Sequence, residues 1–176
     1  MSSESDLALI EPSLEWQHEL RCYIDAFRAE GLDKLHGLFP AELFDTPATL
    51  IGRLCEYSRG ENLNQGWVPS STWFAAKGRI IVGNINLRHR LTPFLEKMGG
   101  QVGYSVHPQH RNKGHATRML ALLLPHARGL GLQRLLITCD DTNVASARVI
   151  EKNGGVLSDK IPRDGGALGR RYWVEL

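Results

Sequence analysis

The sequence predicts a single α/β domain in which helices cover the faces of a mixed sheet. From residue 72 onward, strand-like and helix-like segments alternate along the chain, which is the order typical of helices packed on a sheet. The 176 residues contain no internal repeat and no linker that would divide them. Hydrophobic residues make up 42% of the chain and charged residues 23%, so a full core is expected and a disordered or collagen-like chain is excluded.

Residues 1–71 predict a short strand followed by helices. Residues 7–10 form an apolar run before Pro12, and Ser13 is a suitable N-cap for a helix whose apolar residues recur every three or four positions. Residues 46–57 predict a second helix. The rest of this part is irregular and contains several prolines, and irregular segments often determine substrate specificity.

Strands are the first elements expected after residue 71. Residues 72–76 and 80–87 predict a hairpin whose tight turn uses Gly78. The elements expected after it are a strand at 101–106, a helix at 116–128, a strand at 134–139, a helix at 143–152 and strands at 156–160 and 169–176. Pro125 predicts a kink or an early end in the first of these two helices.

Charge is distributed unevenly between the two parts of the chain. The net charge of the whole chain is +2, but residues 1–70 carry −7 and residues 71–176 carry +9. A basic second part predicts an anionic ligand there. The acidic first part, which includes Glu42, Asp45, Glu56 and Glu61, hints at a cationic acceptor.

The cysteines and the N-terminus both indicate a soluble, cytoplasmic protein. Cys22, Cys55 and Cys139 are widely spaced, lack the spacing of a zinc site and are expected to be reduced thiols. Residues 1–6 do not resemble a signal peptide, and the apolar run at residues 119–124 is too short to cross a bilayer. We therefore expect no membrane partner.

The loop at residues 106–117 is the most informative stretch for function. A strand ends there and a helix begins, so unpaired backbone N–H groups and the positive end of the helix dipole meet at one place. Gly114 allows a phosphate to approach the backbone, and Arg111, Lys113 and Arg118 add positive charge. These cations oppose the helix dipole, at a cost of about a few tenths of a kcal/mol each, unless an anion is bound. The loop therefore predicts a diphosphate site, although it matches neither a Walker A loop nor GxGxxG.

The spacing Arg111-x-x-Gly114-x-Ala116 resembles the coenzyme-A pyrophosphate motif of the GNAT superfamily of acyltransferases. Residues 136–143, followed by residues 144–154, are similar to the second conserved block of that superfamily: a strand, an Asn, a short helix and a Gly. The resemblance covers residues 72–176 well and is strongest to a group of bacterial predicted acetyltransferases.

The resemblance implies one GNAT-like domain over residues 1–176, with an acceptor side in residues 1–71 and an acetyl-CoA-binding core in residues 72–176. Its sheet would be largely antiparallel and splayed between the strands at 101–106 and 134–139, with acetyl-CoA in the gap. It further implies a list of cofactor-binding residues: Tyr104, Ser105, Val106, Arg111, Asn112, Lys113, Gly114, His115, Ala116, Thr117, Asn143 and Ser146. The reaction would be direct attack of a neutral amine on the thioester.

The catalytic positions depart from the superfamily's pattern. Many members carry a Tyr acid where this chain has Ile150, and a Glu base where it has Gln101. His89 is the first candidate base because its reference pKa lies near neutrality, although a surface histidine is an equal alternative. Other candidates are Asp140 or Asp141 as the base, a water chain ordered by Gln101, and Tyr172 as the acid.

Several other patterns have an ordinary structural explanation. His107, His110 and His115 lie close together in sequence, but no carboxylate accompanies them, so we expect solvated side chains and no metal. Trp67, Trp73 and Trp173 are expected to be buried anchors rather than an aromatic substrate cage.

Three classes of function are consistent with these patterns. The first is an N-acetyltransferase that acts on a primary amine of a small molecule or peptide, and a homodimer is common among similar proteins. The second is a non-catalytic acyl-CoA-binding module. Nucleic-acid binding is disfavoured because the basic residues gather at a helix N-terminus and are not interleaved with aromatic residues.

Overall fold

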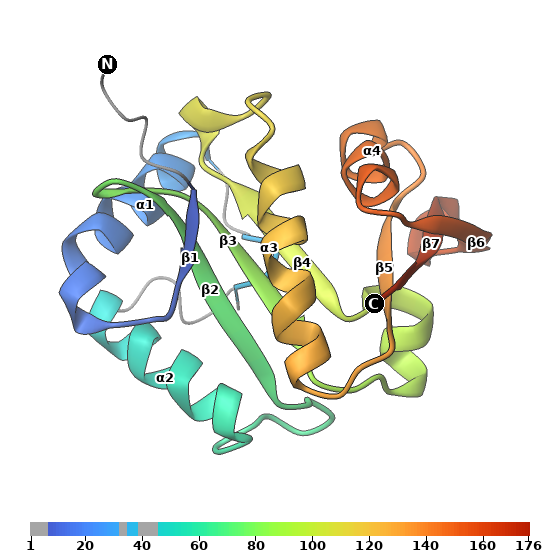
Figure 1. The fold of residues 1–176 in the computed structure, drawn as a ribbon, viewed down its shortest axis with the longest axis horizontal. Coiled ribbons are helices and arrows are strands. Elements are labelled where there is room, and N and C mark those ends of the chain that lie inside the picture. Colours follow the sequence, from blue (N-terminus) through green and yellow to red (C-terminus); the bar gives the residue numbers. More distant parts are fainter. Residues whose placement is uncertain (1–6, 32–34, 39–45) are drawn as a thin grey trace.

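The computed structural model describes residues 7–31, 35–38 and 46–176. Its strands form two sheets, and its helices lie on both sides of the larger sheet (Figure 1). The larger sheet has the order β1-β2-β3-β4, and the smaller sheet has the order β5-β7-β6. Every strand pair recorded in the two sheets is antiparallel.

The first half of the chain builds the larger sheet and the helices on one of its faces. Its elements are β1 (Ala8–Ile10), η1 (Leu14–Trp16), α1 (Gln17–Ala29), α2 (Pro47–Arg59), β2 (Ser70–Lys77), β3 (Ile80–Arg88), the π-helical turn η2 (Leu95–Gly99) and β4 (Val102–Val106). Ser13 caps η1 by accepting a hydrogen bond from the Glu15 amide. Thr46 caps α2 in the same way through the Thr49 amide.

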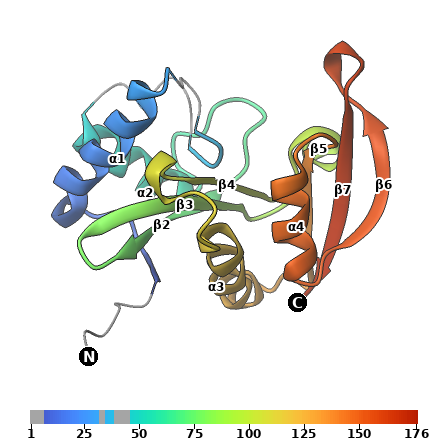
Figure 2. The ribbon, with the colours of Figure 1, turned by 90° about the horizontal axis from the view of Figure 1, so that it is seen from above.

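The second half of the chain supplies the opposite face and the smaller sheet. Its elements are η3 (Pro108–His110), α3 (His115–Gly129), β5 (Arg134–Asp140), α4 (Val144–Lys152), β6 (Val156–Pro162), η4 (Asp164–Gly166) and β7 (Leu168–Glu175). Figure 2 shows α3 on one side of the larger sheet and α1 on the other, while α4 lies beside β5 and β7.

Alternation along β2 explains why helices pack on both faces of the larger sheet. Trp73 and Ala75 belong to the core cluster that contains Met119 and Leu120 of α3. Phe74, which lies between them, belongs to the second cluster, formed with α1 and α2. Successive side chains of a strand point to opposite faces, and full burial of such a side chain contributes about 1.5–3 kcal/mol.

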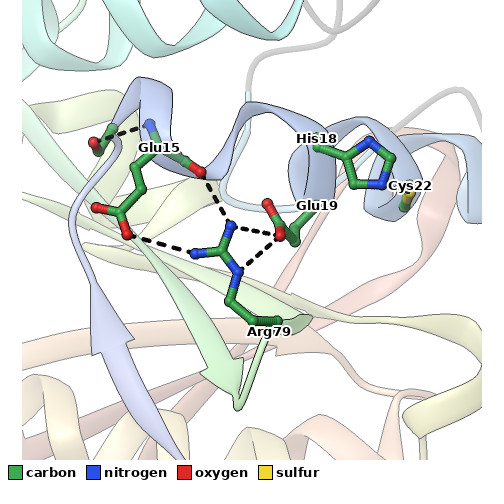
Figure 3. A network of polar contacts seen from close by, with 6 residues as sticks. Glu15, His18, Glu19, Cys22 and Arg79 are labelled. Atoms are coloured by element: carbon green, nitrogen blue, oxygen red, sulfur yellow. Dashed lines mark hydrogen bonds and ion pairs between the residues drawn. The ribbon is translucent and has the colours of Figure 1, made fainter.

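A polar contact fastens the β2–β3 turn to the start of α1. Figure 3 shows the Arg79 guanidinium between Glu15 and Glu19. Its Nε donates to Glu19 Oε1 at 2.9 Å, and its Nη2 donates to the Glu15 carbonyl at 3.2 Å. The guanidinium also lies over the Trp16 ring, 4.3 Å from the centroid. Because Arg79 and Glu15 are exposed, we infer that the network orients the turn rather than adding much stability.

The two sheets meet at Gln101, just before β4. The Gln101 amide donates to the Leu136 carbonyl at 2.7 Å, and the Leu136 amide donates to Gln101 Oε1 at 3.1 Å. Gly100 makes this approach possible, since a Cβ there would lie 2.7 Å from the Leu136 oxygen and its φ is +61°. No ladder joins β4 and β5 among the described strands, so the two sheets separate beyond this contact.

The α/β class, the antiparallel sheets and the splay next to residues 101–106 are confirmed, with the predicted elements in place. One prediction was wrong and one element was missed. Of the kink or early end predicted at Pro125, the early end is wrong: α3 continues to Gly129, and Leu123 and Ala127, on either side of Pro125, are fully buried. The turn η2 lies between the strands predicted at 80–87 and 101–106, where the sequence predicted no element.

Candidate active site

A cavity of about 810 Å³ lies where β4 and β5 diverge. Its size is within the usual range for ligand sites. One side is formed by the α3 N-terminus and α4, and the other by residues 36–37, η2, Arg88 and Arg163. We call these the α3 side and the arginine side.

The α3 side presents backbone donors. Gly114 is the N-cap of α3 with φ +78°, and no side chain among the described residues caps it. Asn112, with φ +62°, turns the loop just before. The first helical hydrogen bond recorded here is from the Arg118 amide to the Gly114 carbonyl at 3.1 Å. The amides of residues 115–117 therefore lack a helical acceptor, and such a helix N-terminus is suited to an anion.

The charges around this site differ from the sequence prediction. Arg111 lines the cavity and pairs with Glu30 of α1 at 3.0 Å. Lys113 donates to the Gln109 carbonyl, and neither Lys113 nor Arg118 belongs to the described lining. Arg148 and Lys152 do line it; they are four residues apart on α4 and so lie on one face of that helix.

The wall between the two sides is the edge of β4. One edge of β4 pairs with β3, in the register Val106↔Gly83 to Val102↔Leu87. The other edge has no strand partner among the described residues, and Tyr104, Ser105 and Val106 line the cavity there. Such an edge offers N–H and C=O groups that an extended ligand can pair with as a strand would.

Two of the residues that line the cavity bring their hydroxyl groups together. Tyr104 Oη and Ser146 Oγ are 2.7 Å apart, and both residues line the cavity with Cys139. Burial raises the pKa of Tyr104 to about 12, so its hydroxyl stays protonated at neutral pH. Burial also raises the pKa of the Cys139 thiol. Ser146 itself is positioned by Asn143, whose Oδ1 accepts from the Ser146 amide at 3.0 Å.

Every cofactor residue predicted from the sequence lines this one cavity, except Lys113. The structure thus brings together residues of β4, the α3 N-terminus and the α4 N-terminus. Asn143 is the residue that caps α4.

The two predicted catalytic residues do not lie in the described lining. His89 follows β3, and its Nε2 is 2.8 Å from Ser71 Oγ. Burial lowers the pKa of His89. Gln101 is 3% exposed, and its side-chain oxygen is engaged by the Leu136 amide. Gln101 therefore joins the two sheets, and this contact explains its position without a role in ordering water.

The alternative acids and bases are also engaged in ion pairs or hydrogen bonds. Asp140 lines the cavity and pairs with Arg163 at 2.8 Å. Hydrogen bonds from Lys160 and Arg170 lower the pKa of Asp141. Tyr172 is fully buried and donates to Glu151 Oε1 at 2.9 Å. Ile150, in the position of the superfamily's Tyr, is fully buried in the core.

The carboxylates behind the hint of a cationic acceptor are not among the described residues that line the cavity. Glu56 and Glu61 do not line the cavity, and Glu61 pairs with Arg59. Glu42 and Asp45 lie outside the described residues. Of the residues that the structure describes, Asp140 is the one carboxylate in the lining, and Arg163 neutralises it.

Sequence reasoning missed Arg88, Arg163 and the side chain of Tyr104. The alternation in β4 could have identified Tyr104, because it lies within the strand predicted to face the ligand. The neighbouring sequence does not distinguish Arg88 or Arg163 from the other arginines, because each is brought to the cavity only when the chain folds.

Segment 35–38 is held at the cavity by the Ser105 hydroxyl, which donates to the His36 carbonyl at 3.1 Å.

Two further features concern metals and membranes. Within residues 7–31, 35–38 and 46–176, no group of three or more His, Cys, Asp or Glu side chains is placed to hold a metal ion. Burial is the largest cause of the lowered pKa values of His107, His110 and His115. No helix in the described part of the chain combines the length and apolar character of a membrane span.

Part of the chain is similar in sequence to two curated proteins. Part of the chain is 29% identical over 80 residues to the uncharacterized N-acetyltransferase YnaD of Bacillus subtilis (strain 168), a match covering 43% of this chain. It is 31% identical over 71 residues to the L-amino acid N-acyltransferase MnaT of Escherichia coli (strain K12), a match covering 40% of this chain. The matches span less than half of the length of these relatives, 44% and 40%.

Similarity in fold extends over almost the whole chain. The crystal structure of the microcin C7 self-immunity acetyltransferase MccE, in complex with acetyl-CoA and AMP, has a TM-score of 0.70. It covers 97% of this chain and 93% of its own, with 16% sequence identity. The model of the Acetyltransferase (GNAT) domain family matches residues 37–156, more than half of the chain. The chain therefore belongs to the GNAT acetyltransferase family, and the resemblance seen in its sequence is confirmed.

Proposed function

We propose that this protein transfers an acetyl group from acetyl-CoA to a primary amine of a small molecule or peptide. The observation that carries the proposal is the single cavity in which an uncapped helix N-terminus and an unpaired strand edge meet. An anionic group and an extended polar chain are what these two features bind, and coenzyme A contains both. The acetyl-CoA in the MccE structure supports the same cosubstrate.

The proposed binding roles follow from the positions of the residues. The amides of His115, Ala116 and Thr117 would hold the pyrophosphate, with Arg111 contributing charge. The edge of β4 would bind the pantetheine arm, and Asn143 and Ser146 would lie beside it. Acetyl-CoA supplies the activated thioester when bound.

The Tyr104 hydroxyl is the proposed hydrogen-bond donor to the departing sulfur. Its raised pKa keeps the proton on the oxygen, and Ser146 fixes its orientation. In the transfer, the amine nitrogen forms a bond to the carbonyl carbon and the carbon–sulfur bond breaks. The nitrogen loses one proton and the sulfur gains one, so the products are an amide and the free thiol of CoA. Donors in a cavity sheltered from water stabilise such developing charge more strongly than water does.

A non-catalytic acyl-CoA-binding module is the second candidate. It is favoured by one observation: the usual acid and base positions are occupied by Ile150, in the core, and by Gln101, which joins the sheets. Calorimetry with CoA and thiol release from acetyl-CoA with an amine panel distinguish the two candidates. Binding with turnover supports the enzyme, whereas binding without turnover on any amine supports the module. An absence of CoA binding contradicts both.

A further inference from the structure

The arginine side of the cavity contains a guanidinium that has no counterion among the described residues. Arg88 lines the cavity, and the pairs recorded among the described residues include no carboxylate for it. Its Nη1 donates to the carbonyls of Gly99 and Gly100, at 3.4 and 3.1 Å. Burial lowers the pKa of Arg88, yet an arginine in a protein stays charged at neutral pH. A half-buried charge without a partner is costly unless a ligand supplies one.

Arg163 adds a second incompletely satisfied cation on the same side. Its Nη1 pairs with Asp140, but its Nε and Nη2 are buried without a hydrogen-bond partner among the described residues. It follows β6 at the tip of the β6–β7 hairpin, and Figure 2 shows this tip on the side away from α3. A second hollow of about 500 Å³ joins the cavity there and shares Met98, Asp140 and Arg163 with it.

The phosphates of CoA are badly placed to neutralise Arg88. Arg88 directly follows Leu87, which pairs with Val102 at the start of β4, whereas the α3 anion site lies beyond Val106 at its end. Five strand residues span roughly 14 Å from the first to the last. Tyr104, which marks the proposed reacting centre, is only two residues from Val102, or roughly 7 Å along the strand. An anionic group on the acceptor itself fits Arg88 better.

We propose that the acceptor is a carboxylate-bearing amine, such as a free amino acid, and that Arg88 binds its carboxylate, while Arg163, paired with Asp140, lies on the same side. This inference rests on the proposed acetyltransferase function and names the substrate class for the same cavity. A planar guanidinium suits a carboxylate because it can donate two parallel hydrogen bonds. The amine would then point from Arg88 toward Tyr104.

The test compares L-amino acids with their α-amides, which keep the amine and lose the carboxylate. With acetyl-CoA, kcat/KM from thiol release should be roughly 10- to 100-fold higher for the acid than for its amide, the usual range for a hydrogen bond to a charged group. In Arg88→Gln this ratio should fall toward one, and Arg88→Lys should restore part of it. Arg90→Gln is the matched control, because Arg90 is exposed two residues away and lies outside the described lining.

A binding measurement provides a readout independent of turnover. The thermal midpoint of the CoA-loaded wild-type protein should rise more with the amino acid than with its amide at equal ionic strength, and Arg88→Gln should remove that difference. Turnover of amides at least equal to that of acids would overturn the inference while leaving the acetyltransferase proposal intact. Absence of all turnover, with the carboxylate preference kept in binding, would overturn the acetyltransferase proposal alone. An unchanged acid-to-amide ratio in Arg88→Gln would exclude Arg88 as the carboxylate site.

Discussion

The α3 side of the cavity presents mainly backbone groups, whereas the arginine side presents charged side chains from separate parts of the chain. The amides of residues 115–117 come from one helix start, and their direction is fixed by Gly114. Arg88 and Arg163 come from the end of β3 and from the β6–β7 hairpin. The first side is therefore suited to an invariant group such as a pyrophosphate. The charge on the arginine side can change with a single substitution, so acceptor specificity would vary on that side.

The largest effect is expected from Gly114→Glu, which tests whether the α3 side is the anion site. The carboxylate would stand where the phosphates are proposed to bind, and CoA affinity should fall by roughly 100-fold or more, because like charges cost several kcal/mol. Calorimetry with CoA measures this loss.

Gly131→Glu is a closely matched control for that substitution. Gly131 has the same φ of +78° and the same open surroundings, but it lies beyond the other end of α3. Both variants should lose about 1–2 kcal/mol from the left-handed backbone, and only Gly114→Glu should lose CoA binding. Equal CoA affinities in the two variants would show that the loop is assigned wrongly.

Tyr104→Phe is expected to have the next largest effect. It tests the proposed role of the Tyr104 hydroxyl, in the wall between the two sides. The kcat should fall roughly 100-fold, the usual contribution of a positioned proton-donating group, while CoA affinity should change little. Since the pKa of Tyr104 is raised to about 12, the protonated form persists well above neutrality. Deprotonation of Tyr104 should therefore not lower kcat until the pH approaches that value.

Tyr172→Phe supplies the comparison for Tyr104→Phe. Tyr172 is fully buried and its hydroxyl binds Glu151, outside the described lining of the cavity. It should keep its kcat although it loses a buried hydrogen bond. A kcat for Tyr104→Phe within about twofold of that of Tyr172→Phe would remove Tyr104 from the mechanism; normal general acid effects are far larger.

Gln101→Ala tests how the two sides are held together. The variant leaves the Leu136 amide without its side-chain acceptor, so the free energy of unfolding should fall by about 1–3 kcal/mol. Urea denaturation measures it, with the exposed Gln133→Ala as control, expected within about 0.5 kcal/mol of wild type. If the two variants are equally stable, the Gln101 side chain does not help to join the sheets in solution.

The α3 side could be predicted from sequence because it is local. Arg111, Gly114 and Ala116 lie within six positions of one another, and Asn143 and Ser146 lie within one short helix. The arginine side could not be predicted, because Arg88 and Arg163 are brought to one cavity only by the splay of two sheets. Gln101 could not be assigned from sequence for the same reason. The sequence suggested a catalytic position, but the residue joins the two sheets through Leu136, which is distant in sequence.

The smallest effect on turnover is expected from His89→Ala, the residue that the sequence favoured as the base. His89 is held by Ser71 outside the described lining, and burial lowers its pKa, so it is neutral at pH 7 and loses its charge at a lower pH than an ordinary histidine. Its removal should lower the free energy of unfolding by about 0.5–1.5 kcal/mol through the lost hydrogen bond. The kcat and its pH profile should match those of the exposed control His18→Ala. If kcat lost its pH dependence in His89→Ala but not in His18→Ala, His89 would be the base. The arginine side would then extend further along β3 than its lining indicates. An unchanged profile would leave deprotonation of the acceptor amine to groups within the cavity or to solvent.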